Sequence, residues 1–329
     1  MTRSFQKNDV RKILVISLSN LGDVILTTPV FSVLKGQFPK AFLSVVTGPK
    51  AEPLLEGSCT VDEVIVYDKK NLNFFQKIKF VFELRKKHFD LVIDLRNTLI
   101  PYLIHPFSYR NRFVFGKTTA SMRERHLSHL DFLNIPKMQT RFDFFSEKDR
   151  EECQTKLKSK SILAEKGFMV IAPGAGSYLK RWRIEGFSNV AHYFSSQGKQ
   201  IVVVGSEKER ELGDQIEANS YEKIVNMCGS LSLRELAALL HGASLVLCCD
   251  SGVMHLANEL NAPVVAIFGP TDERKYAKFG PHNRVVRKEL DCTPCELAHC
   301  RFDRQYCMED IATREVIQTC EELLGVHAH

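Results

Sequence analysis

Residues 12–37, KILVISLSNLGDVILTTPVFSVLKGQ, decide the fold class. Residues 12–18 form an almost unbroken apolar run, the pattern of a strand that is buried on both faces of a parallel sheet. A turn follows at 19–23, and the apolar spacing beyond it predicts a helix over about 23–37. The stretch is therefore one strand–helix unit of an α/β fold.

The same alternation of apolar runs and helical periodicity continues along the chain. In the first half it predicts a helix at 74–88 and strands near 42–47, 64–67, 90–95 and, more weakly, 112–115. In the second half it predicts helices near 184–196, 207–218, 232–241 and 252–260, between strands near 168–172, 200–204, 224–227, 244–249 and 263–268. The chain is therefore expected to form two doubly wound, Rossmann-like domains.

A charged stretch at 147–160, EKDREECQTKLKSK, predicts a solvated helix between the two series of strands. We place the domain boundary there, between residues 1–160 and 161–329. A last helix over about 313–324 could pack on either domain. Ligands of open parallel sheets bind at the carboxyl ends of the strands, so two such domains predict a site in a central cleft.

Composition excludes several classes of protein. The chain has 329 residues, 44% of them hydrophobic and 26% charged, which excludes a small disulfide-stapled scaffold. No apolar run approaches the roughly 18 to 20 residues that a membrane helix needs. The first twelve residues lack the apolar core of a signal peptide, so we expect the ten cysteines to lie in a reducing cytosol.

The formal charge of +6 is unevenly distributed. Residues 1–160 hold 27 Lys and Arg against 17 Asp and Glu, whereas residues 161–329 hold 18 against 22. This split suggests an anionic partner for the first domain and a different one for the second, although solvated charge is the alternative explanation. We expect no nucleic-acid partner.

The first motif, SNLGD, follows the first strand. Gly22 allows a backbone to approach closely, and the carboxylate of Asp23 can face the cleft from the start of a helix. The structural alternative for Asp23 is a helix N-cap, a position that Asp commonly takes.

The second motif, PGAGS at 173–177, again follows a buried strand and is followed by Lys180, Arg181 and Trp182. Small residues expose backbone N–H groups, Ser177 adds a hydroxyl, and the two basic residues add charge, so the motif could cradle a diphosphate. It lacks the glycine patterns of nicotinamide-binding and P-loop proteins. Trp182, the sole Trp, is predicted to be a packing residue.

The third motif, DSGVMH, follows the fourth strand of the second half. The carboxylate of Asp250 can accept hydrogen bonds from sugar hydroxyls. The N–H groups of Ser251, Gly252 and Val253 open a helix that can hold phosphate oxygens. His255 lies one turn further, as a ligand contact or as a structural histidine.

Four cysteines lie within sixteen residues of the tail: Cys292, Cys295, Cys300 and Cys307. Their spacing permits an all-thiolate structural zinc site, and four unbound thiols are the alternative.

These motifs, in this order, resemble the heptosyltransferases of lipopolysaccharide core assembly, glycosyltransferase family nine. The resemblance rests on ILVISLSNLGDVILTT, PGAGSYLKRW, IVVVGSEKE, the block from Cys228 to Asp272, and the Cys-rich tail. It implies a GT-B fold, with the acceptor in the first domain and the nucleotide sugar in the second. It also implies inverting transfer of heptose from ADP-L-glycero-D-manno-heptose to an inner-core acceptor, with no catalytic metal or cofactor.

Roles carry over by motif as implications of this resemblance. Asp23 matches the catalytic base, and Lys180 the basic contact to the donor diphosphate. The other implied contacts are Glu207 to the ribose, Asp250 to the heptose hydroxyls, Ser177, Ser251, Gly252 and His255 to the donor, and Asn20, Gly22 and Arg123 to the acceptor. Arg183 stands where many relatives have Pro.

The resemblance implies a lipid-linked anionic acceptor and peripheral contact with the cytoplasmic face of the inner membrane. A loop-like region after Pro101 carries basic residues suited to such a surface, with solvated charge as the alternative: Arg110, Arg112, Lys117, Arg123 and Arg125. Alternative functions are a transferase with another nucleotide sugar, a non-catalytic nucleotide-sugar-binding protein, and an epimerase on the same plan.

Overall fold

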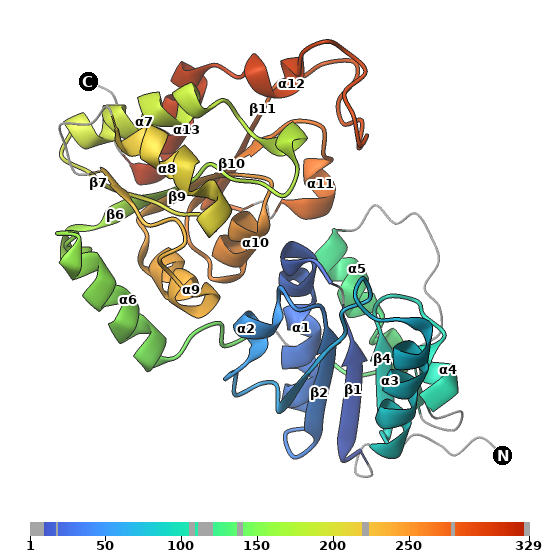
Figure 1. Ribbon diagram of the computed structural model, residues 1–329. Helices are drawn as coiled ribbons and strands as arrows, with labels where there is room; N and C mark the ends of the chain where they lie inside the picture. Colours follow the sequence, from blue (N-terminus) through green and yellow to red (C-terminus); the bar gives the residue numbers. More distant parts are fainter. Residues whose placement is uncertain are drawn as a thin grey trace. The chain divides into compact units, whose positions relative to one another are not determined.

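The computed structural model describes residues 10–17, 19–104, 109–110, 121–136, 141–218, 224–277 and 280–325. The chain divides into two compact units, Met1–Phe144 and Phe145–His329. Each unit is an α/β structure built on one sheet (Figure 1).

The first unit has a sheet of five strands: β1 Lys12–Ile16, β2 Phe42–Thr47, β3 Glu63–Val66, β4 Leu91–Asp94 and β5 Tyr109–Arg110. Their order is β3-β2-β1-β4-β5, and all pairs are parallel. The helices are α1 Leu21–Gln37, α2 Glu52–Leu55, α3 Phe74–Lys86, α4 Ile100–Ile104 and α5 Met122–Ser128.

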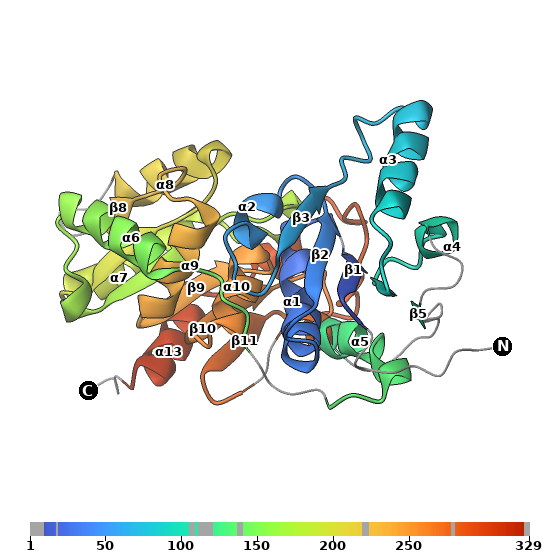
Figure 2. The ribbon, with the colours of Figure 1, turned by 90° about the horizontal axis from the view of Figure 1, so that it is seen from below.

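The first sheet is covered on both faces, which explains the continuous apolar run of β1. Leu14 and Ile16 pack with Leu84 of α3 and Ile104 of α4 on one face. Helix α1 lies on the opposite face, as Figure 2 shows, and its residues from Val24 to Leu34 are all buried.

The second unit has a sheet of six strands: β6 Phe168–Ala172, β7 Gln200–Val203, β8 Ile224–Asn226, β9 Leu245–Cys249, β10 Val264–Phe268 and β11 Asn283–Arg287. Their order is β11-β10-β9-β6-β7-β8, with all pairs parallel. The helices are α6 Glu147–Ser159, α7 Ile184–Ser196, α8 Arg210–Glu217, α9 Leu233–Gly242, α10 Gly252–Glu259, α11 Glu273–Tyr276, α12 Tyr306–Glu309 and α13 Thr313–Leu324.

Strand order reverses at one place in each sheet. Strand β1 lies between β2 and β4, and β6 lies between β7 and β9. The connections that leave β1 and β4 therefore depart in opposite directions, as do those that leave β6 and β9. The crevice between two such loops is where open α/β sheets bind ligands.

The predicted doubly wound class is confirmed, and α7 and α13 have the predicted bounds. Strand β11 was missed. Helix α13 packs against α7 and the strands β9, β10 and β11, so it belongs to the second unit.

The break between units lies at Phe144/Phe145, upstream of the expected 160/161. Helix α6 packs on α9 and joins the second unit. Lys156 Nζ lies 2.6 Å from Glu235 Oε1, and Arg234 Nε donates to Asp149 Oδ2 at 3.0 Å. The charged stretch is therefore an integral helix of the second unit, because its charges pair with α9.

The region after Pro101, expected to be loop-like, is helical in part of its described residues. It contains most of α4 and all of α5, and α5 begins with a capping box in which Ser121 and Glu124 exchange hydrogen bonds. Residues 105–108 and 111–120 of this region lie outside the described residues. The strand expected at 112–115 lies outside the described residues. Within the described residues, no helix is long and apolar enough to cross a membrane.

Helix α5 packs against α1 and brings two histidines into the interior. His126 and His129 are 3% and 4% exposed. Burial lowers the pKa of both histidines to about 4. The positive charge of Arg125 lowers both pKa values further, and His129 also lowers that of His126. The negative charge of Asp131 opposes the shift of His129. Both side chains are therefore neutral in the folded protein at pH 7.

We expect the stability of the first unit to fall as the pH drops from about 6.5 to 4. Histidines of the unfolded chain take up protons in this window, whereas the buried ones do not, at a cost of up to about 3 kcal/mol each. Above this window the contribution is complete. Urea unfolding of wild type and of His126→Gln/His129→Gln at pH 7.5 and 5 tests this, because the variant should show a smaller loss. An equal loss would contradict it, and His241→Gln, on exposed α9 surface, is the control.

Candidate functional site

The loop after β6 is anchored by Trp182, which is 3% exposed. Its backbone N–H donates to Cys249 Sγ at 3.4 Å, and its indole N–H donates to the carbonyl of Ile311 at 3.3 Å. Trp182 is thus the packing residue that its sequence context predicts. By holding the loop against the end of β9, it sets the position of Lys180, two residues earlier.

Lys180, in the loop after β6, and Asp250, directly after β9, form an ion pair. Their Nζ and Oδ2 atoms are 2.6 Å apart, and Asp250 is 4% exposed at the end of β9. His255 Nε2 lies 4.0 Å from the other carboxylate oxygen. The ring of Tyr276 lies 5.8 Å from Lys180 Nζ and 6.3 Å from the His255 ring. The structure therefore gathers Lys180, Asp250 and His255, and it adds Tyr276, which the sequence analysis missed.

Helix α10 begins beside this ion pair. Ser251 is its extended N-cap residue, and the Ser251 hydroxyl is buried without a hydrogen-bond partner among the described residues. The first N–H groups of a helix, which here begins at Gly252, have no partner within the helix and carry partial positive charge. With the Lys180 ammonium, these donors form a place for an anionic group.

The two glycines of the PGAGS loop have different surroundings. A Cβ atom on Gly174 would lie 1.8 Å from Glu209 Oε1, whereas one on Gly176 would meet nothing within 4 Å. Gly174 therefore makes room for Glu209, which also closes a capping box with Ser206. Gly176 has open space above it, and Ser177 beside it caps the short turn that carries Lys180, accepting from the Leu179 N–H at 3.3 Å.

Glu207 follows β7, the neighbour of β6, and so lies at the same edge of the sheet. The guanidinium of Arg210 donates to both of its carboxylate oxygens, at 2.7 and 2.6 Å, and lowers the pKa of Glu207. Gly229 leaves room for it, since a Cβ there would lie 2.0 Å from Glu207 Oε2. The carboxylate is thus ionised and largely exposed, with Arg210 as its partner.

In the first unit, Asn20 is the N-cap of α1 and Asp23 is the third residue of the helix. The alternative of Asp23 as N-cap is therefore wrong, because the helix starts two residues earlier than expected. The Asn20 side-chain amide donates to Asp23 Oδ2 at 3.0 Å. The first turn of α1 therefore presents a partly exposed carboxylate whose orientation is set by the Asn20 amide.

Arg96 was missed by the sequence analysis. It follows β4, the neighbour of β1, and its Nη1 donates to Ser19 Oγ at 3.0 Å. Asp94, 4% exposed, accepts from the backbone N–H of Arg96 at 2.9 Å and from Thr98. Burial raises the pKa of Asp94, although these hydrogen bonds oppose the shift. The polar residues that follow the apolar run at 91–93 could have identified Arg96 from the sequence.

Arg123 lies in the first turn of α5, the helix that packs on α1. It therefore belongs to the same unit as Asp23. Of the other basic residues expected near it, Arg112 and Lys117 lie outside the described residues.

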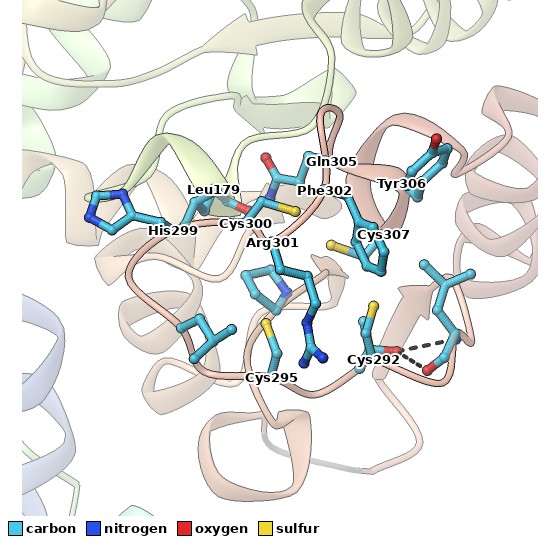
Figure 3. Close-up of a pocket in the computed structure, with 14 residues that line it drawn as sticks. Leu179, Cys292, Cys295, His299, Cys300, Arg301, Phe302, Gln305, Tyr306 and Cys307 are labelled. Carbon is cyan, nitrogen blue, oxygen red and sulfur yellow. Dashed lines mark hydrogen bonds between the residues drawn. The ribbon is translucent and has the colours of Figure 1, made fainter.

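The four tail cysteines line one pocket of the second unit, together with Leu179 and Arg301 (Figure 3). Within the described residues, no group of three or more Cys, His, Asp or Glu is placed to share a metal ion. The zinc site is thus not confirmed and stays a prediction. Burial raises the pKa of Cys307 to about 11, which keeps it a thiol here.

The Cys-rich segment also braces the loop that carries Lys180. The Gln305 amide donates to the carbonyl of Leu179. Arg183 donates to the carbonyl of Glu309 and to Thr313 Oγ1 at 3.1 Å. The segment therefore contributes to the position of the lysine.

The chain is similar to known glycosyltransferases. A family model described as glycosyltransferase family 9 (heptosyltransferase) matches residues 109–305. The chain is 27% identical to lipooligosaccharide heptosyltransferase 2 of Campylobacter jejuni, over 92% of this chain and 95% of the relative.

Two solved structures resemble both units. A family 9 glycosyltransferase from Veillonella parvula has a TM-score of 0.82 at 24% identity, covering 98% of this chain and 99% of that one. The ADP-heptose lipopolysaccharide heptosyltransferase II of E. coli has a TM-score of 0.75 at 24% identity, covering 95% and 98%. The expected GT-B fold is confirmed.

Proposed function

Since the chain belongs to glycosyltransferase family 9, the heptosyltransferase family, and is a glycosyltransferase, we propose that it transfers heptose from ADP-L-glycero-D-manno-heptose to a lipopolysaccharide inner-core acceptor. The observation that carries the proposal is the Lys180–Asp250 ion pair beside the start of α10. It combines a cation and helix N–H groups, which suit a diphosphate, with a carboxylate that suits sugar hydroxyls. The similarity to a lipooligosaccharide heptosyltransferase and to an ADP-heptose lipopolysaccharide heptosyltransferase supports the sugar, the base and the acceptor class.

On the donor side, Lys180 and the first N–H groups of α10 hold the diphosphate. As the bond to the anomeric carbon breaks, negative charge grows on the departing ADP, and these fixed donors stabilise it. Ser251 adds a hydroxyl that has no other partner among the described residues. Asp250 accepts from the heptose hydroxyls, and Glu207 and His255 complete the donor contacts.

On the acceptor side, Asp23 acts as the general base. Its carboxylate, oriented by Asn20, takes the proton of the acceptor hydroxyl as the oxygen attacks the anomeric carbon. A single displacement of this kind inverts the anomeric configuration. Arg96 and Arg123 supply positive charge for an anionic acceptor. The charge that stabilises the leaving group comes from the protein, so the reaction needs no metal ion or other cofactor.

A lipid-linked acceptor places the enzyme at the cytoplasmic face of the inner membrane as a peripheral protein. The excess of basic residues in the first half of the chain fits an acceptor that carries phosphate or carboxylate groups. The donor is an anion, yet it binds to the half of the chain that carries a net negative charge. Local groups such as Lys180 and the N–H groups of α10 account for its binding.

The test is an assay of ADP release and product mass with ADP-heptose and defined core acceptors. We expect ADP release only when an acceptor is present, a glycosidic bond of inverted configuration, and unchanged rates in EDTA. Turnover of UDP or GDP sugars without turnover of ADP-heptose would reject the donor. An isomerised sugar formed without acceptor would indicate an epimerase, and donor binding without any turnover would indicate a non-catalytic protein.

A further inference from the structure

Helix α3 presents a stripe of large apolar side chains to solvent. Phe74, Ile78 and Phe82 are 70%, 40% and 57% exposed and lie four residues apart, so they share one side of the helix. Phe75, 79% exposed, lies beside them. Such contiguous exposed apolar surface is rare on soluble proteins without a partner.

The opposite side of α3 is firmly packed. Leu84 is 2% exposed and belongs to the core cluster under the sheet, and Phe80 and Val81 pack against that cluster. The helix also begins with a capping box in which Asn73 and Gln76 exchange hydrogen bonds. The exposed stripe is therefore a property of a well-formed, anchored helix.

The neighbouring segment also carries exposed apolar side chains. Helices α3 and α4 contact each other and lie side by side in both views of the ribbon (Figures 1 and 2). Around α4, Leu99, Tyr102 and Leu103 are also exposed. We call the seven exposed side chains the apolar face: Phe74, Phe75, Ile78, Phe82, Leu99, Tyr102 and Leu103.

Basic residues are concentrated in the same segment of the chain as α3. Residues 69–88 contain seven Lys and Arg but a single acidic residue, Glu83. The formal charge of this segment therefore equals the +6 of the whole chain. Glu83 is itself paired with Lys86 at 2.8 Å. A helix with aromatic side chains on one side and Lys and Arg on the flanks is typical of a surface that lies in the interface of an anionic membrane.

We propose that the apolar face docks on a bilayer that contains anionic lipids. The aromatic rings would enter the headgroup region, and the basic residues would meet the lipid phosphates. A second copy of this chain would bring two such basic surfaces together, which disfavours a dimer through this face. The identity of the membrane rests on the proposed function, because a lipid-linked acceptor is found there.

Vesicle co-sedimentation of the purified full chain tests the proposal. We expect binding to vesicles of phosphatidylglycerol and phosphatidylethanolamine, weaker binding at high salt, and little binding to phosphatidylcholine. Phe74→Ser/Phe75→Ser/Phe82→Ser should weaken binding to the anionic vesicles at least about tenfold. The matched control is Phe42→Ser/Phe132→Ser, which changes two phenylalanines of the same unit, 47% and 41% exposed, outside the apolar face.

A second pair of variants tests the charges. Lys79→Glu/Lys86→Glu should weaken binding, whereas Lys158→Glu/Lys160→Glu, in exposed positions at the end of α6, should not. Melting curves establish that all variants fold.

The proposal is overturned if the aromatic variant binds anionic vesicles like wild type. It is also overturned if light scattering shows a wild-type dimer that this variant converts to a monomer, since the face would then join two copies. A detergent-dispersed acceptor separates the two proposals. Normal transfer without vesicle binding removes the docking surface alone, and vesicle binding without transfer removes the proposed function alone.

Discussion

Replacement of Asp23 by Asn is expected to reduce heptosyl transfer at least about a hundredfold, the lower range for a positioned general base. The amide cannot take the acceptor proton, but its oxygen can still accept the hydrogen bond from Asn20 that orients the side chain. Donor binding depends on groups of the other unit and should be unchanged. The measurements are kcat for ADP release with saturating acceptor, and the Kd for ADP by calorimetry.

The matched control is Glu147→Gln, which removes a carboxylate from the first turn of α6. Like Asp23→Asn, it removes one negative charge near the start of a helix, but far along the chain from the proposed base. It should leave kcat within about twofold. Its expected effect is on stability alone, by about 0.3 to 1 kcal/mol for a charge at a helix terminus. Near-normal turnover by Asp23→Asn would exclude Asp23 as the base. A large loss of ADP affinity would instead indicate a structural role.

Replacement of Lys180 by Ala is expected to lower kcat/KM for the donor by about a hundredfold to a thousandfold, as for loss of one fixed donor to a developing anion. It should also destabilise the second unit, because Asp250, 4% exposed, would lose its cationic partner. The loss for a fully buried pair is about 3 to 5 kcal/mol. Since Lys180 is 34% exposed, we expect about 1 to 3 kcal/mol.

Two further variants separate binding from stability. Lys180→Ala/Asp250→Ala removes both charges, so it should recover part of the lost stability while activity stays low. Lys148→Ala breaks an exposed pair with Glu152, 3.8 Å apart, and should change stability by less than about 1 kcal/mol and activity not at all. If Lys180→Ala kept normal turnover, the diphosphate contact would have to be assigned to other groups.

Local pattern was sufficient for the fold class and for most elements. Buried parallel strands need continuous apolar runs, so β2 and β6 could be located within the chain. Amphipathic periodicity located α7 and α13. The sequence also places Asp23 in the first turn of a helix, Asp250 directly after a strand and Lys180 in the loop after β6, because turn residues mark the ends of these elements.

The tertiary structure decided how these pieces meet. Lys180 and Asp250 are seventy residues apart, and their contact depends on β6 and β9 being neighbours, which strand pairing alone determines. Arg96 reaches Ser19 for the same reason, through β1 and β4. Local sequence does not encode such nonlocal pairing.

Burial is the second quantity that only the tertiary structure supplied. Helix α3 was expected from its sequence, but nothing in its pattern says that Phe74 and Phe82 face solvent while Leu84 is buried. Helix α6 resembled a solvated connector until its charges were found paired with α9. The sequence by itself thus determined the kinds of elements and the chemistry carried at their ends. The partners of each residue were decided in three dimensions, because contacts between distant segments set both charge pairing and exposure.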